Sequence, residues 1–174
     1  MSILYIDESK ANGYTIVAVV MVSGDISTVR KAIADLRMPG QRRIHFTKES
    51  DPRRRLILAR LVELGVRVRI YHVAGRNERE ARALCLAAIA AEAAESGVTR
   101  IVLERDDSIE EQDRRTLYRE LEARGIRERI AYSHDTSAGE LLLCLPDAVA
   151  WSFAKGGDWH RRIDPMIIEV RRLS

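Results

Sequence analysis

The 174-residue sequence has few of the residues that cross-link a small fold. It contains two cysteines, Cys85 and Cys144, and each lies among aliphatic residues. They form neither a C-x-x-C pair nor a cluster with histidine, which excludes a disulfide framework and a cysteine-based zinc site. We therefore expect both cysteines to be small core residues, in a protein of a reducing, cytoplasmic compartment.

Long apolar runs and an excess of one charge are also missing. No stretch approaches the ~20 apolar residues of a membrane-spanning helix, and no basic region precedes the first apolar stretch, so we expect neither a membrane span nor a signal peptide. The 29 Lys and Arg nearly balance the 26 Asp and Glu. Charge alone therefore does not indicate a polyanion-binding tail. The length suits a single domain over residues 1–174.

Phosphate-binding loops are absent and aromatic residues are scarce. The sequence has no P-loop, no Rossmann glycine motif and no G-x-S-x-G elbow, which disfavours the chemistries that depend on them. Of the two tryptophans, we expect Trp151 to be a core residue and Trp159, in a Gly-Gly-Asp-Trp-His loop, to be exposed for contacts with bases. Basic pairs such as Arg42-Arg43 could line a groove for a phosphate backbone.

What the sequence does contain is an alternation of strand and helix patterns. Two early apolar runs, 3–6 and 14–22, predict a β-hairpin. Strands that come first in the chain, followed by strands that alternate with helices, predict an α/β fold with a mixed sheet and helices on both faces. Period-2 patterns predict further strands over 42–47, 66–73, 99–106, 129–133 and within 163–173, and helical spacing predicts helices over 25–36, 51–64, 77–96, 109–124 and 138–154.

Several acidic residues interrupt apolar patterns. Asp7 and Glu8 end the first strand, and because successive strand residues point to opposite faces, their side chains should diverge. Asp147 follows Pro146 and interrupts the most apolar face of the last helix. A buried carboxylate has to be protonated, paired with a basic side chain or bound to a metal. A strand-end position or an ion pair with arginine remains open for Asp7, and a turn cap for Asp147.

The fifth predicted strand supplies further acids, because Glu104 and Asp106 share one face of it. Together with Asp7 and Asp147 they form the set that a two-metal phosphoryl-transfer site needs. Hard Mg²⁺ or Mn²⁺ ions prefer carboxylate oxygens, and two of them roughly 4 Å apart stabilise both the attacking and the leaving oxygen. His45 could move a proton or contact a phosphate, since histidine titrates near neutral pH, or it could be structural.

Three motifs carry a resemblance to a known family: Tyr5-Ile6-Asp7-Glu8-Ser9, Ile44-His45-Phe46, and the segment 141–150 with Pro146-Asp147. Through them, nearly the whole chain resembles the DUF3800 family, a branch of the ribonuclease H-like superfamily. The resemblance implies a ribonuclease H-like mixed sheet, with antiparallel first strands and then parallel strands. It also implies a metal-dependent nuclease that acts on nucleic acid. Its motif positions fall on Asp7, Glu8, Ser9, His45 and Asp147.

The sequence thus leads to the hypothesis of a Mg²⁺- or Mn²⁺-dependent nuclease. Asp106 is favoured over Glu104 and Asp107 as the middle ligand. The predicted metal ligands are Asp7, Asp106 and Asp147, and the predicted catalytic residues are Asp7, Glu8, His45, Glu104, Asp106 and Asp147.

Two departures from the family pattern support a different function. Lys10 stands where the family prefers Gly, and Pro146 stands where it prefers Ala. Lys10 could compete with a metal for the carboxylates, and Pro146 could tilt Asp147 away from them. The alternatives are a catalytically inactive binding or assembly module of the same fold, and a phosphatase or nucleotide hydrolase that uses the same metals. A C-terminal edge strand would be one route to a homodimer.

Overall fold

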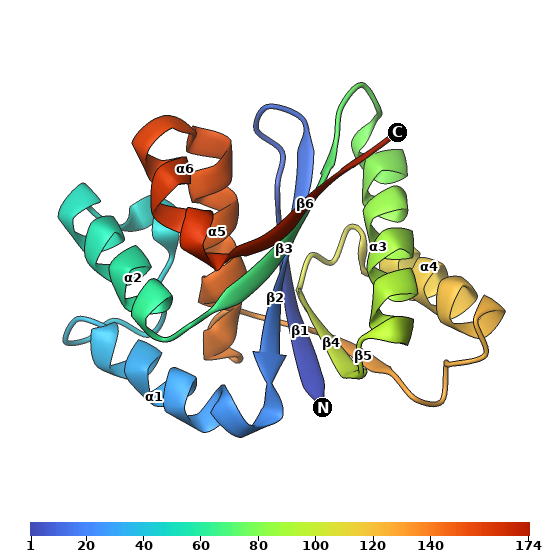
Figure 1. Cartoon of the computed structure of the whole chain (residues 1–174), viewed down its shortest axis with the longest axis horizontal. Helices are drawn as coiled ribbons and strands as arrows, with labels where there is room; N and C mark the ends of the chain where they lie inside the picture. Colours follow the sequence, from blue (N-terminus) through green and yellow to red (C-terminus); the bar gives the residue numbers. More distant parts are fainter.

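The computed structural model describes residues 1–174 and has a six-stranded mixed sheet between two layers of helices (Figure 1). The strand order is β5-β4-β1-β2-β3-β6. The first three strands are antiparallel to their neighbours in the chain: β1 (Ser2–Ser9), β2 (Tyr14–Val22) and β3 (Arg67–Val73). The other three join in parallel: β4 (Val98–Glu104), β5 (Ala131–Asp135) and β6 (Ile167–Leu173). This confirms the expected α/β fold class, with a mixed sheet whose first strands are antiparallel and whose later strands are parallel.

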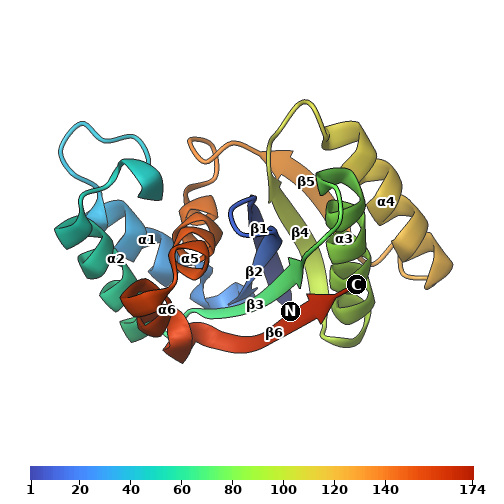
Figure 2. The same ribbon diagram turned by 90° about the horizontal axis from the view of Figure 1, so that it is seen from above.

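Helices cover both faces of the sheet, as Figure 2 shows. One face carries α1 (Ile26–Leu36), α2 (Asp51–Glu63), α5 (Cys144–Lys155) and α6 (Gly157–Ile163). The opposite face carries α3 (Glu78–Glu95) and α4 (Glu110–Ala123). Short 3-10 turns complete the chain: η1 (Ser23–Asp25), η2 (Phe46–Lys48), η3 (Leu141–Leu143) and η4 (Asp164–Met166).

None of the helices combines the length and the apolar character that a membrane span requires.

Two of the predicted helices have a side-chain cap at their N-terminus. Asn77 accepts a hydrogen bond from the backbone N–H of Glu80, as expected for the start of α3. The cap of α2 is Ser50, whose hydroxyl accepts from the backbone N–H of Arg53. Asp51 and Pro52 occupy the first turn, where a missing N–H costs little.

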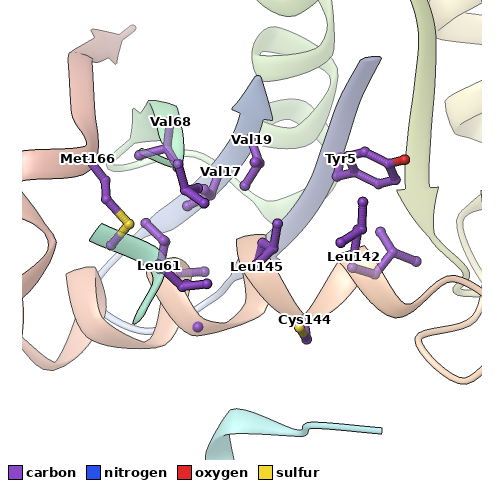
Figure 3. Packing of buried hydrophobic residues seen from close by; sticks show 14 of the residues in the cluster. Tyr5, Val17, Val19, Leu61, Val68, Leu142, Cys144, Leu145 and Met166 are labelled. Atoms are coloured by element: carbon purple, nitrogen blue, oxygen red, sulfur yellow. The ribbon is translucent and has the colours of Figure 1, made fainter. Parts of the chain in front are cut away.

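Each face of the sheet has its own hydrophobic core. On the α5 side, Tyr5, Val17 and Val19 pack against Leu142 and Leu145 (Figure 3). On the α3 side, the alternate residues of the same strands, such as Leu4, Ile6 and Ile16, pack against Cys85, Leu86 and Ile89. The strands β1 and β2 are thus buried on both faces, which explains their nearly continuous apolar sequence. Asp7 and Glu8 lie where these two apolar layers end.

The predicted strand over 42–47 is wrong. These residues form a loop that leads into η2, although Ile44 and Phe46 are buried as their alternation indicated. A strand needs a partner, and the edge of β3 is already occupied by β6. The segment therefore buries alternate side chains without joining the sheet, and the backbone at His45 stays extended with φ −117° and ψ 107°.

The end of the chain also differs from the expectation. The helix predicted over 138–154 begins only at Cys144, because Pro146 has no N–H and is tolerated only in the first helical turn. The segment expected as an exposed loop forms α6, and its Trp159 is half-buried, with its ring edge-on to Trp151. Trp151 itself is half-buried and packs at the margin of the core.

Candidate functional site

A polar cleft of about 550 Å³ opens beyond the ends of β1 and β4. These strands are parallel neighbours, so their carboxyl ends meet at the same edge of the sheet. No hydrophobic residue lines the cleft, and all six residues predicted as catalytic do so. The nine lining residues are Asp7, Glu8, His45, Glu104, Arg105, Asp106, Asp107, Ser137 and Asp147.

Asp7 lies on the α5 face of β1, in line with Tyr5, as the period of two predicts. Its carboxylate accepts a hydrogen bond from the backbone N–H of Glu8 at 2.8 Å, and it has no ion pair with lysine or arginine. Burial, followed by the negative charges of Glu8, Asp147 and Glu104, raises the pKa of Asp7 well above its usual value. The ion pair with arginine that remained open for Asp7 does not form.

Asp147 reaches the same cleft from the first turn of α5. Its carboxylate accepts a hydrogen bond from the backbone N–H of Phe46 at 2.9 Å. Burial raises the pKa of Asp147, while this hydrogen bond and the charges of His45 and Arg43 act in the opposite direction. Pro146 is buried and leaves Asp147 within the cleft lining, so the proline does not turn the acid away.

Glu104 and Asp106 both line the cleft but differ in their surroundings. Glu104 ends β4, and burial raises its pKa, with Asp147 adding to this and a hydrogen bond from Ser137 opposing it. Asp106 lies in the following loop, where its Oδ1 accepts from the backbone N–H and the hydroxyl of Ser108, at 3.0 and 2.6 Å. These hydrogen bonds lower the pKa of Asp106. Glu104 is therefore the middle acid whose charge acts on Asp7.

His45 extends from the loop before η2 into the cleft. Its Nδ1 atom is buried and has no hydrogen-bond partner in the protein. A buried polar atom without a partner is costly, so such atoms call for an explanation. Both His45 and Asp147 line the cleft.

Glu8 points to the opposite face from Asp7, as predicted, and meets a buried arginine there. Arg82 of α3, only 3% exposed, lies with its Nη1 atom 3.1 Å from Oε2 of Glu8. Arg82 also donates to Tyr14 at 2.9 Å and makes two hydrogen bonds to Asp113, at 2.6 and 2.7 Å. His134 closes the group with Nε2 at 3.0 Å from Asp113.

This network was not expected, although the sequence contains a signal for it. Arg82 shares the buried face of α3 with Leu86 and Ile89, at helical spacing. Asp113 precedes Leu117 on the buried face of α4 in the same way. A charged residue within an apolar helical stripe predicts a buried partner of opposite charge. Although burial alone would lower the pKa of Arg82, its hydrogen bonds to Asp113 and the charge of Glu8 raise it.

The basic side chains near the cleft are engaged by partners other than Asp7, Glu104 and Asp147, and of them only Arg105 lines the cleft. Lys10 pairs with Glu78 at 2.8 Å, so it does not form an ion pair with Asp7 or Glu8. Arg105 pairs with Asp107 at 2.8 Å, and Arg43 donates to the hydroxyl of Ser137. The acids Asp7, Glu104 and Asp147 therefore share the cleft without an ion pair to neutralise them.

The side chains fit a hard divalent cation in chemical type. Carboxylate oxygens are the ligands that Mg²⁺ and Mn²⁺ prefer, and the raised pKa of Asp7 and the unpartnered Nδ1 of His45 point to a missing positive or polar group. However, no three His, Cys, Asp or Glu side chains form a group that could hold a metal ion as they stand. Binding a cation would require the carboxylates of Asp7, Glu104 and Asp147 to draw together.

Comparisons with known proteins add no family to this description. No protein-family model matches the chain, and no curated protein matches its sequence. The resemblance to the DUF3800 family therefore stays a prediction from the motifs.

Proposed function

We propose that the cleft is the active site of a metal-dependent nuclease that hydrolyses a phosphodiester bond with Mg²⁺ or Mn²⁺. The observation that carries this proposal is that Asp7, Glu104 and Asp147 line one cleft without an ion pair to lysine or arginine. Like charges that share a buried site repel one another, and a divalent cation between them would relieve this repulsion.

Asp7 and Asp147 would hold the metal, with one acid from the end of β4. The charges favour Glu104 over the Asp106 expected from the sequence, because Glu104 acts on Asp7 while Asp106 accepts two hydrogen bonds from Ser108. Two bound ions would activate a water molecule and stabilise the leaving oxygen of an in-line displacement.

The remaining residues of the cleft would position the reactants. Glu8 is fixed at the cleft wall by Arg82, so it can orient a water molecule or a substrate hydroxyl without turning away. His45 lines the cleft, so its ring can bind a phosphate oxygen or transfer a proton when a substrate fills the cleft. These roles correspond to the motif positions Glu8 and His45.

Nucleic acid is the proposed partner, and the cytoplasm the proposed compartment. Both cysteines are free and buried, which suits a reducing environment. A homodimer remains a prediction. Its proposed route is the outer edge of β6, the strand at the end of the sheet.

A catalytically inactive binding or assembly module is the second candidate. The absence of a group of three side chains that could hold a metal without movement favours it. The two candidates differ in metal binding, because a cation that binds only the native state raises the melting temperature by mass action.

The test combines metal binding with cleavage. Purified wild type, Asp7→Asn and Asp147→Asn are melted with and without Mn²⁺, with Asp25→Asn, an exposed acid outside the cleft, as the matched control. We expect Mn²⁺ to stabilise the wild type and the control only. The same proteins then receive single-stranded, double-stranded and hybrid substrates with Mg²⁺ or Mn²⁺. Cleavage that both cleft variants retain would reject the proposed site, and the absence of any Mn²⁺ effect on the wild type would favour the inactive module.

A further inference from the structure

A second pocket lies beside the acidic cleft, and its lining contains a basic residue in place of acids. It measures about 360 Å³, and its lining includes Ser9, Asn12, Trp151 and Lys155 but no acidic residue. Lys155 makes no ion pair with a carboxylate, and its Nζ atom lies 6.0 Å from the centre of the Trp151 ring. We call this the Trp151 pocket. An aromatic ring beside a free lysine suits a base and its phosphate, and a carboxylate would repel the phosphate.

The same two elements build the cleft and the Trp151 pocket. On β1, Asp7 lines the cleft and Ser9, two residues on and on the same face of the sheet, lines the pocket, about 7 Å away along the strand. On α5, Asp147, Trp151 and Lys155 are spaced by four residues, which places them on one side of the helix at steps of about 6 Å. The acids of the cleft and the lysine of the pocket are therefore carried by the same strand and the same helix.

The Trp151 ring is held firmly in place. The guanidinium of Arg54 lies 4.3 Å from the centre of the ring and is itself fixed by hydrogen bonds to the backbone oxygens of Phe46 and Thr47, at 2.9 and 2.7 Å. Phe46 and Trp159 contact the ring edge-on, at 5.3 and 5.2 Å between centres. A ring fixed before binding loses little conformational freedom when a base stacks on it.

The β1–β2 hairpin forms the other wall of the pocket. Asn12 at its tip donates from its side chain to the backbone oxygen of Ala154, at 3.1 Å, and so attaches the hairpin to the end of α5. The distance between the two walls is thereby set by a direct contact near the pocket and by the packing of β1 on α5 in the core.

We propose that the Trp151 pocket binds a nucleotide of single-stranded nucleic acid, next to the phosphate that lies in the cleft. The base would contact the Trp151 ring and the phosphate would contact Lys155. A single strand is required, because a base that is paired and stacked in a duplex cannot present its face to a protein side chain. This inference rests on the proposed function of the cleft and adds the substrate class, which the metal chemistry leaves open.

Fluorescence tests the stacking contact directly, because the chain has two tryptophans. In Trp159→Phe, Trp151 is the sole tryptophan, and in Trp151→Phe only Trp159 remains. We expect an oligothymidylate to quench the emission of Trp159→Phe on titration and to leave the emission of Trp151→Phe unchanged. Binding without quenching in Trp159→Phe, or equal quenching in both variants, would overturn the stacking contact.

The affinity for an oligothymidylate, measured for a matched pair of lysine variants, tests the phosphate contact. Lys155→Ala and Lys31→Ala are compared by anisotropy of a labelled oligothymidylate over a range of salt concentrations. Lys31 is an exposed lysine of α1 without an ion pair. We expect Lys155→Ala to weaken binding severalfold and to reduce the slope of log K against log salt by about 0.7, the value for one phosphate of a single strand. Equal behaviour of the two variants would contradict the lysine contact.

Binding and cleavage are tested separately, because only cleavage requires the metal. All titrations contain a chelator, so the oligothymidylate stays intact and binding is measured without metal. Quenching and salt dependence as expected, with no cleavage when Mn²⁺ is restored, would reject the nuclease and keep the binding site. A duplex of the same sequence is the final control, because equal quenching by duplex and single strand would overturn the assignment to single strands.

Discussion

Arg82 of α3 lies 3.1 Å from the carboxylate of Glu8, while the neighbouring Asp7 has no ion pair. The alternation of the strand sends these adjacent acids to opposite faces of the sheet, where they meet different surroundings. Glu8 is neutralised within a buried network, and Asp7 faces Asp147 and Glu104 across the cleft. Glu8 is therefore held in place by an arginine, whereas Asp7 is the acid that we propose as a metal ligand.

The raised pKa of Asp7 predicts an unusual pH dependence of stability. Because the carboxyl has a higher pKa in the folded state than the ~3.9 of an unfolded chain, the native state binds more protons between these values. The ionised group therefore costs stability at neutral pH, and this cost disappears as the pH falls below the unfolded value. We expect Asp7→Asn, melted with a chelator, to unfold at a higher temperature than wild type at pH 7 and at the same temperature below about pH 4.

Asp106→Asn is a control for which we expect the opposite change in melting temperature at pH 7. Hydrogen bonds from Ser108 lower the pKa of Asp106, so its ionised form stabilises the fold above the unfolded pKa, and this contribution is lost as the pH falls through the folded value. We expect a slightly lower melting temperature than wild type at pH 7 and no difference in strong acid. The Asp7 explanation fails if both variants shift in the same direction at pH 7.

The third metal ligand can be assigned by comparing two acids of the cleft. Glu104→Gln should abolish the stabilisation by Mn²⁺, because the charge of Glu104 acts on Asp7. Asp106→Asn should retain most of it, since Asp106 accepts hydrogen bonds from Ser108. At a Mn²⁺ concentration about 100 times Kd, the stabilisation at stake is about 2.7 kcal/mol. The opposite ranking in a thermal shift titration would return the ligand role to Asp106.

The Arg82 network predicts strong coupling between its members. Arg82→Met leaves the buried carboxylate of Asp113 without its two hydrogen bonds and should destabilise the protein by about 3–5 kcal/mol. Adding Asp113→Leu removes the unpaired charge, so the double variant should lose less stability than the sum of the two single variants. Urea unfolding of all four proteins measures the coupling, and strictly additive losses would show that the two side chains act independently.

At the tip of the β1–β2 hairpin, we expect the substitution of Gly13 to strain the backbone and destabilise the fold. Gly13 has φ 101°, and an added Cβ atom would lie 2.8 Å from Cε1 of His72. Gly13→Ala should therefore destabilise the fold by about 1–3 kcal/mol. Gly24→Ala is the matched control, because nothing lies within 4 Å of its Cβ position and its φ is not positive. Similar unfolding free energies for the two variants would contradict the strain at Gly13.

Periodicity in the sequence was sufficient for most of the fold. The alternation in β1, β2 and β3 and the apolar stripes of α1 to α4 follow from local side-chain directions. The segment around Ile44 and Phe46 shows the limit of such patterns, because alternate burial does not require a paired strand. The extra helix α6 and the place of Trp159 were missed, since a short glycine-containing helix has little periodicity of its own.

Five acids, together with His45 from the motif that resembles a known family, could be selected as a candidate site from the sequence alone. How these acids differ depends on tertiary contacts: Glu8 meets Arg82, Asp106 accepts from Ser108, and the charge of Glu104 acts on Asp7. It also placed Trp151 and Lys155 beside the cleft, along the helix that carries Asp147. The physical reason is that side-chain direction follows from local geometry, whereas burial and the sign of the nearest charge depend on contacts between segments far apart in the chain.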